Sequence, residues 1–181
     1  AKKYDLIAHI QTDSLINMAD FSSAEKLFAQ ITALKKLLNS NGKLILQTYN
    51  WENPAIEISA HGDYPTFFQT ESNQRKLLNY PPFGLLVKLT LKGKSEAKVK
   101  IEAETLFSQL TTKLPNYPTI QLLGPYQSIF WQKNPSYHII LKYNLESYNL
   151  ESRNKAIEKI ASLLEKGSKK YQIEVEPEGI Q

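Results

Sequence analysis

Aromatic and basic residues gather between two segments that have the pattern of strands, and together they could bind nucleic acid. Trp131 and Lys133 lie in this interval, and Tyr137 opens the strand that follows. Aromatic side chains can stack on unpaired bases while a neighbouring cation contacts the phosphate backbone. The same pattern also suits aromatic rings that simply cover a sheet or a neighbouring helix. The residues therefore predict a base-stacking site, with a purely structural role as the alternative.

Lysines form a second candidate site, around a strand predicted over residues 85–91. Lys88, Lys92 and Lys94 recur there, and each could contact a phosphate group. The formal net charge of +4 and the pI of about 9.1 permit nucleic-acid binding without requiring it. Because glutamates are interspersed among the lysines just beyond this strand, a solvated surface without a ligand is the alternative.

The residue types that catalysis or metal binding would need are absent or poorly placed. The sequence has no cysteine, which excludes disulfides, zinc–cysteine sites and thiol catalysis. It has no G-x-x-x-x-G-K-[ST] phosphate loop, and its three histidines are far apart in the sequence. Asp13, Ser14 and Asp20 suit turns and helix caps better than catalysis. The sequence therefore predicts no catalytic residue, no metal site and no cofactor site.

Hydrophobic periodicity indicates the elements that must position the candidate residues. The first 50 residues predict a buried strand over 4–10, a helix from Asp20 that residues 39–42 stop, and a strand over 43–49. The apolar run Leu44-Ile45-Leu46 is typical of a strand buried on both faces. This order predicts a parallel strand pair joined by a crossover helix. A helical connector, closed by a double proline, follows it.

The pattern becomes regular from residue 83 onward. Strands are predicted at 85–91, 120–123, 137–143 and 171–176, and the first alternates apolar and polar residues as a half-buried strand does. Ser95 and Ser152 can act as the N-caps of two intervening helices. The order β-α-β-β-α-β is that of a split βαβ, ferredoxin-like domain. The whole chain is therefore predicted to be α/β, of the α+β type.

The sequence gives no sign of a membrane segment. No apolar run approaches the roughly 18 to 20 residues that a bilayer span requires. The first residues also lack the apolar stretch and cleavage site of a signal peptide. We therefore expect a soluble, cytoplasmic protein without a membrane partner.

Several short segments stand out from this generic pattern by their order and spacing. They are Asp13-Ser14, Gln47-Thr48-Tyr49-Asn50, the run from Asp63-Tyr64 to Tyr80-Pro81-Pro82-Phe83, Leu123-Gly124-Pro125, and Glu174-Val175-Glu176-Pro177. In this order they resemble the C-terminal part of the primosomal protein N′ (PriA-type) family of replication-restart DNA helicases. The run that ends in Tyr80-Pro81-Pro82-Phe83 is the most specific match. The resemblance covers nearly all of the chain.

The resemblance implies a division of the chain and a set of partners. Residues 1–50 resemble a remnant of the RecA-like second helicase lobe, residues 51–82 a helical connector, and residues 83–181 a ferredoxin-like, ribosomal protein S10-like domain. The implied partners are single-stranded or branched DNA, single-strand binding protein and other primosome proteins. Arg153 and Lys155 open the last helix, near where this family docks the acidic tail of single-strand binding protein, so they are candidate partner-binding residues.

The sequence also departs from the family. Members of the family that it resembles use ATP for 3′–5′ DNA unwinding and bind zinc through cysteines. Residues 31–38 stand where the family has a glutamine-glycine-arginine motif that contacts the γ-phosphate. Lys35 and Lys36 keep positive charge there but cannot reproduce the planar contact of arginine. We therefore expect neither ATP hydrolysis nor a zinc cofactor in this chain.

The sequence favours a chain that binds DNA or replication-restart partners without catalysis. Two other functions remain open. One is a pure protein-interaction module, and the other is a small-ligand regulatory domain, because the ferredoxin-like fold serves many functions.

Overall fold

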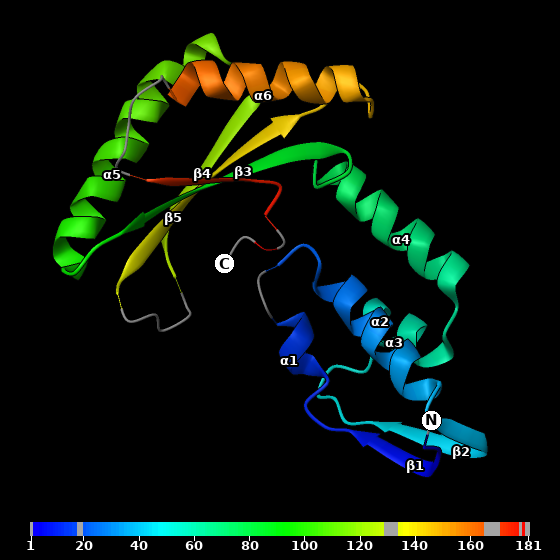
Figure 1. The fold of residues 1–181 in the computed structure, drawn as a ribbon. Coiled ribbons are helices and arrows are strands. Elements are labelled where there is room, and N and C mark those ends of the chain that lie inside the picture. The colour runs from blue at the N-terminus through cyan, green and yellow to red at the C-terminus, as the bar shows by residue number, and fades with distance from the viewer. Residues whose placement is uncertain (1, 18–19, 129–133, 165–170, 178, 180–181) are drawn as a thin grey trace. The chain divides into compact units, whose positions relative to one another are not determined.

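A computed structural model describes residues 2–17, 20–128, 134–164, 171–177 and 179 (Figure 1). Helices and strands are mixed along the chain, so the predicted α+β class is confirmed. The chain divides into two compact units, Ala1–Gln74 and Arg75–Gln181. None of the helices within the described ranges is both long and apolar enough to cross a membrane.

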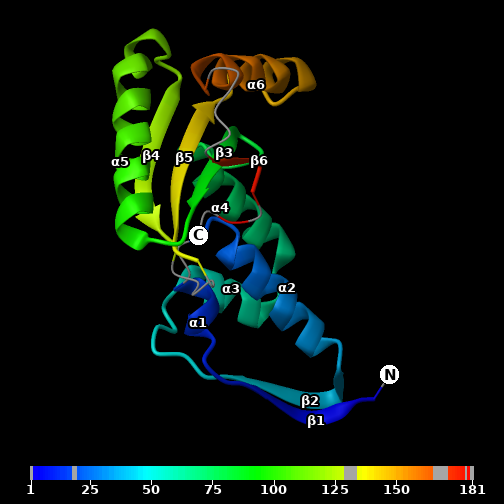
Figure 2. The same cartoon turned by 60° about the vertical axis from the view of Figure 1, so that its left-hand side comes forward.

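The first unit contains two parallel strands joined through a helix. Its elements are β1 (Tyr4–His9), α1 (Asp13–Ile16), α2 (Ser23–Lys35), β2 (Leu38–Leu46), α3 (Pro54–His61) and most of α4 (Tyr64–Leu77). Strands β1 and β2 pair in parallel, and Figures 1 and 2 both show them side by side. The predicted strand–helix–strand order is thereby confirmed.

Helix α2 supplies the core of this unit. Leu27 and Ile31 are fully buried and pack with Ile56 of α3. Phe28 stacks on Phe67 of α4, with 4.3 Å between the ring centroids. The three α2 residues share one face because helical neighbours are three or four positions apart.

Strand β2 begins earlier than predicted. Tyr4 pairs with Leu38 and Leu6 pairs with Lys43, so residues 39–42 form an irregularity within the strand instead of a stop before it. Polar residues and a glycine are typical of turns, and they also suit a bulge in a strand. Local sequence does not separate these two outcomes.

The predicted burial of β1 is wrong, and so is the predicted burial of Leu44-Ile45-Leu46 on both faces of β2. Leu6 is 56% exposed and Ile45 is 53% exposed. Leu44 and Leu46, in contrast, pack on the core that α2 forms. Successive strand side chains point to opposite faces. When helices cover only one face, only every second residue of the strand is buried.

The second unit is a four-stranded sheet with two long helices. Its elements are β3 (Gly84–Lys92), α5 (Glu96–Lys113), the 3₁₀ helix η1 (Leu114–Asn116), β4 (Ile120–Gln127), β5 (Ser136–Asn144), α6 (Leu150–Leu164) and β6 (Gln172–Val175). The strands lie in the order β4-β5-β3-β6, and all neighbours are antiparallel. The predicted order of strands and helices is confirmed.

One face of this sheet and both helices form a single core. The sheet contributes alternate residues such as Leu89 and Ile139, which are fully buried. Val99 and Ala103 of α5 and Ile160 of α6 pack against them. Burial of apolar surface on this scale is the main force that stabilises such a domain.

Strand β3 is buried on both faces, and the predicted half-buried strand is wrong. Leu86, on the face away from the helices, is fully buried. On this side of the sheet Lys88 Nζ donates to Gly179 O at 3.2 Å, while Glu176 N continues the pairing of β6 with β3 by donating to Leu86 O at 2.8 Å. Gly179 is 91 residues from Lys88, so this contact leaves no local pattern in the sequence.

Helix α6 begins before the predicted cap. Ser152 lies inside the helix, and its backbone N–H donates to the Asn149 side chain at 2.9 Å. Asn149 therefore makes the capping hydrogen bond that the sequence assigned to Ser152, because asparagine and serine serve equally well at this position.

Strand β4 continues past its predicted end at Gly124. Its pairing with β5 is irregular between Leu123 and Tyr126. Gly124 has a φ of 113°, in the region that favours glycine, and a Cβ there would lie 2.8 Å from His138 O. Glycine therefore lets the strand bend without ending.

The variant Gly124→Ala is expected to lower the free energy of unfolding by roughly 2 kcal/mol, because alanine would adopt a strained φ and displace His138 O. Gln127→Ala, at an exposed position of the same strand, is the control and should change the free energy by less than about 0.5 kcal/mol. Urea unfolding measures both. Equal losses in the two variants would contradict the requirement for glycine.

Candidate nucleic-acid interface

The sheet face that points away from α5 and α6 carries the lysines of the central strands. We call it the outer face, and its residues are Leu86, Lys88, Thr90 and Lys92 of β3, His138, Ile140 and Lys142 of β5, Gln121 of β4 and Glu174 of β6. Their neighbours in sequence fill the core beneath the helices. Because strand side chains alternate, burial of those neighbours determines which residues reach the outer face.

The three lysines predicted to contact phosphate differ in their partners. Lys88 is largely buried, and its ammonium lies 3.1 Å from Glu174 Oε2, so its charge is already offset. Lys92 ends β3 and Lys94 follows it, and both are exposed. Neither makes an ion pair with a residue that the structure describes. Lys92 and Lys94 are therefore the two predicted lysines whose charge is available to a ligand.

His138 lies among these lysines in the neutral state. Its Nδ1 is 3.0 Å from Thr90 Oγ1 in the buried part of the sheet. Burial lowers the pKa of His138 below its ordinary value of 6.5, and the nearby charges of Lys88 and Lys92 lower it further. At neutral pH His138 therefore adds no positive charge to those of the lysines on the outer face.

Lys142 is a basic residue of this face that the sequence did not predict to bind a ligand. It is 8% exposed, and its ammonium lies 3.9 Å from the centre of the Tyr80 ring. Burial lowers the pKa of Lys142 below its ordinary value. Among the described residues, no oxygen accepts a hydrogen bond or ion pair from this ammonium. Its place in the alternation of β5 was the one signal in the sequence that could have identified it.

The turn before β3 holds Tyr80 against Lys142. Tyr80 N donates to Arg75 O at 2.8 Å, and Arg75 Nη1 donates to Pro81 O at 3.3 Å. A Cβ at Gly84 would collide with Asn79 O, so glycine allows the turn to approach the strand. The most specific segment of the sequence therefore has a structural task, which is to place the Tyr80 ring.

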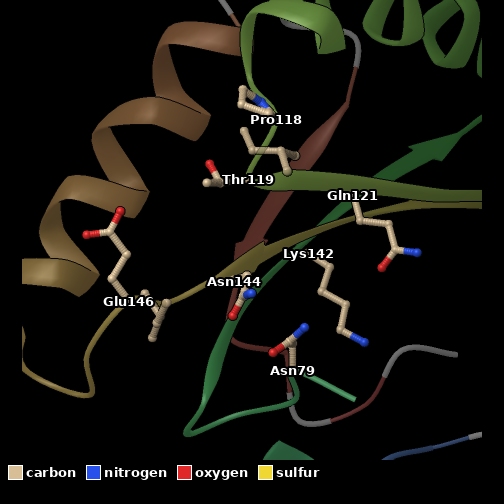
Figure 3. A pocket seen from close by; sticks show the side chains of 9 residues that line it. Asn79, Pro118, Thr119, Gln121, Lys142, Asn144 and Glu146 are labelled. Atoms are coloured by element: carbon tan, nitrogen blue, oxygen red, sulfur yellow. The ribbon is translucent and has the colours of Figure 1, made fainter. Parts of the chain in front are cut away.

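A pocket of about 300 Å³ opens beside Lys142, where β5 ends and β4 begins (Figure 3). Its lining residues, mostly polar, are Asn79, Pro118, Thr119, Ile120, Gln121, Lys142, Asn144, Leu145 and Glu146. Gln121 pairs with Lys142 across the two strands. The pocket thus combines one cation, Lys142, and one carboxylate, Glu146, with several amide groups, which can both donate and accept hydrogen bonds.

The aromatic site predicted beside these lysines is placed only in part. Tyr137 is 6% exposed and belongs to the core beneath the helices, on the face opposite to Lys88 and Lys92. Trp131 and Lys133 lie outside the described residues. The ends of their segment are described: Pro135 O accepts a hydrogen bond from Gly93 N at 3.3 Å, directly beside Lys92.

The two residues predicted to bind a protein partner lie on α6, apart from the outer face. Arg153 makes an ion pair with Glu176, which follows β6. Lys155 lies 2.6 Å from Glu151 one turn earlier, and this hydrogen bond and charge raise the pKa of Lys155. Both cations therefore have acidic partners within the chain.

A family model described as the primosomal protein N C-terminal domain matches residues 76–178. Curated relatives named replication restart protein PriA are also similar. The protein of Synechocystis sp. is 33% identical over 123 residues, which are 66% of this chain and 15% of the relative. The protein of Treponema pallidum is 30% identical over 139 residues, 75% of this chain and 21% of the relative.

The protein of Bacillus subtilis extends the similarity over almost the whole chain. It is 27% identical over 176 residues, which are 94% of this chain and 20% of the relative. The chain thus spans about a fifth or less of the length of these relatives. Among solved structures, the de novo designed protein Foldit4 aligns with 51% of this chain and 92% of its own chain, at 13% sequence identity. The TM-score of 0.31 is too low to indicate a shared fold.

The neutral state of His138 predicts that stability depends on pH. The unfolded chain binds a proton at His138 near pH 6.5, whereas the folded protein resists it, so the free energy of unfolding falls as the pH drops below about 6.5. The loss is at most about 1.4 kcal/mol per pH unit. His138→Gln should remove this loss.

Urea unfolding at several values between pH 7.5 and pH 5.5 measures the effect, in a range above the titration of most carboxylates. The glutamine side chain retains a polar group toward Thr90. Identical pH profiles of the variant and the unaltered protein would refute the role of His138.

Proposed function

This chain belongs to the primosomal protein N (PriA) family, and we propose that it binds single-stranded or branched DNA during replication restart. The match of the family model to residues 76–178 supports the role in restart. The exposed lysines at the end of β3 support the binding of DNA, because cations without acidic partners can replace the counterions of phosphate.

The observation that carries the proposal is the position of Lys92 and Lys94 beside the β4–β5 connection. The hydrogen bond from Gly93 N to Pro135 O joins the two segments. Trp131 and Lys133 belong to this connection in sequence. Exposed cations fit the phosphates of a single strand, and an aromatic residue of this connection could stack on its bases.

We also propose the finer fold assignments that the resemblance implies. The parallel pair β1 and β2, with α2 between them, supports a helicase-lobe remnant over residues 1–50. The strand order β4-β5-β3-β6 supports a ferredoxin-like, S10-like domain over residues 83–181. Residues 51–82, which include α3 and α4, would connect them.

The proposed function includes no ATP hydrolysis by this chain. Ile31 stands in the segment where the family has its arginine motif, and it is fully buried. Lys35 Nζ donates to Ala60 O at 2.6 Å and to Ser59 O at 3.2 Å, at the carboxyl end of α3. A cation favourably placed at a helix C-terminus stabilises packing. This arrangement supports a structural use of Lys35.

Single-strand binding protein and other primosome proteins are proposed as further partners, at Arg153 and Lys155. An acidic peptide would compete with Glu176 and Glu151 for these cations. The Lys155–Glu151 pair is exposed and costs little to open, whereas the Arg153–Glu176 pair is partly buried. The acidic peptide would thus bind at this surface of α6 by displacing Glu151 and Glu176 from the two cations.

Fluorescence anisotropy with labelled single-stranded and forked DNA tests the main proposal. We expect binding at micromolar protein that weakens as salt rises. The double variant Lys92→Gln/Lys94→Gln should weaken binding several-fold. It should also reduce the slope of log affinity against log salt by about 0.7 per lysine on a single strand.

Lys100→Gln is the control, because Lys100 lies on α5 and makes an exposed pair with Glu104 at 3.9 Å. It should bind DNA as the unaltered protein does. Absence of salt-sensitive binding would refute the proposal. Retention of a restart protein at high salt without nucleic acid would favour the pure interaction module instead.

A further inference from the structure

We propose that the pocket beside Lys142 binds the phosphate group of an unpaired nucleotide, with the Lys142 ammonium as its cation. The proposal deepens the proposed DNA binding and relies on it for the source of the nucleotide. None of the predicted binding residues that the structure describes, Lys92 and Lys94 included, lines this pocket.

The charge of Lys142 has no acidic partner among the described residues. Lys142 as a whole residue is only 8% exposed, and its burial disfavours the charged form of the ammonium. The Tyr80 ring compensates part of this charge through the contact at 3.9 Å. A ring offers no hydrogen-bond acceptor of the kind that an ammonium prefers. Among the described residues no carboxylate or carbonyl completes the site, so an anionic ligand would.

Several amides line the pocket together with one cation, Lys142, and one carboxylate, Glu146. Figure 3 shows the side chains of Lys142, Asn79 and Gln121 around the same space, with Asn144 at the end of β5. Their amides can donate to phosphate oxygens and can also pair with the edge of a base. The volume of about 300 Å³ is at the lower limit for small-molecule pockets, which suits one nucleotide.

The pocket lies at one end of the outer face, because Lys142 belongs to both. Lys142 faces the same side of the sheet as Lys92, and Leu86, opposite Lys142, is six residues from Lys92 along β3. At about 3.4 Å per residue, roughly 20 Å separate the two cations along the strand. A single strand of several nucleotides is long enough for this distance, although the middle of the face is covered, since Ile140 is 1% exposed, so its path would pass outside that cover. A lone peptide carboxylate would use the pocket but not the second cation, so a nucleic acid fits better.

Nuclear magnetic resonance titrations of the ¹⁵N-labelled chain test the inference. Thymidine 5′-monophosphate should shift the backbone amides of Thr119, Gln121 and Asn144, whereas thymidine, which lacks the phosphate, should not. A ten-residue oligothymidylate should shift the same amides at lower concentration. Inorganic phosphate, as a third probe, should compete with the monophosphate.

Two variants remove the site in different ways. Lys142→Met deletes the charge but keeps a long side chain on Tyr80. Gln121→Glu places a carboxylate opposite Lys142 at an exposed position and should not disturb folding. Each should weaken monophosphate binding at least tenfold. Lys100→Met, which also removes one positive charge, should leave it unchanged, and circular dichroism checks that every variant is folded.

The outcomes separate this inference from the proposed function. Salt-sensitive DNA binding without shifts at the pocket amides would overturn the pocket and leave DNA binding intact. Shifts with the monophosphate but no binding of DNA would support the pocket and overturn the proposed function. Equal binding of thymidine, or tighter binding of a peptide with a free C-terminal carboxylate, would overturn the assignment to phosphate.

Discussion

Burial of one face of the four-stranded sheet beneath α5 and α6 is the constraint on which the second unit depends. Residues such as Leu89, Ile139 and Leu141 are fully buried there. Because strand side chains alternate, their burial fixes the register, and a shift by one residue would exchange the two faces. The lysines of β3 and β5 consequently lie together on the outer face. The interface is thus a result of core packing.

Local pairing then decides which of the lysines are available. The net charge of +4 says little about this, because several cations already have acidic neighbours. Lys88 is paired with Glu174, and Lys155 with Glu151. Lys92 and Lys142 lack such partners among the described residues, and their geometry carries the two functional proposals.

The turn that positions Tyr80 links the family resemblance to the proposed site. Gly84 permits close approach of the turn to β3, and the Tyr80 ring reaches Lys142 as a result. A segment that carries the family resemblance therefore acts on Lys142, a residue that was not among the predicted binding residues. The face of the Tyr80 ring attracts the Lys142 ammonium and so stabilises part of its charge. Tyr80 does not line the pocket, so the ring leaves that space open to an acidic ligand.

The sequence by itself determined the α+β class, the order of strands and helices and the family, because periodicity and short motifs are properties of neighbouring residues. It also placed Lys88, Lys92 and Lys94 around one strand. Only the tertiary structure decided that β1 and β2 are half exposed, that Tyr137 is in the core, and that Lys142 meets Tyr80. These outcomes depend on contacts between residues far apart in the chain, such as the 91 residues between Lys88 and Gly179, and such contacts leave no periodic pattern in the sequence.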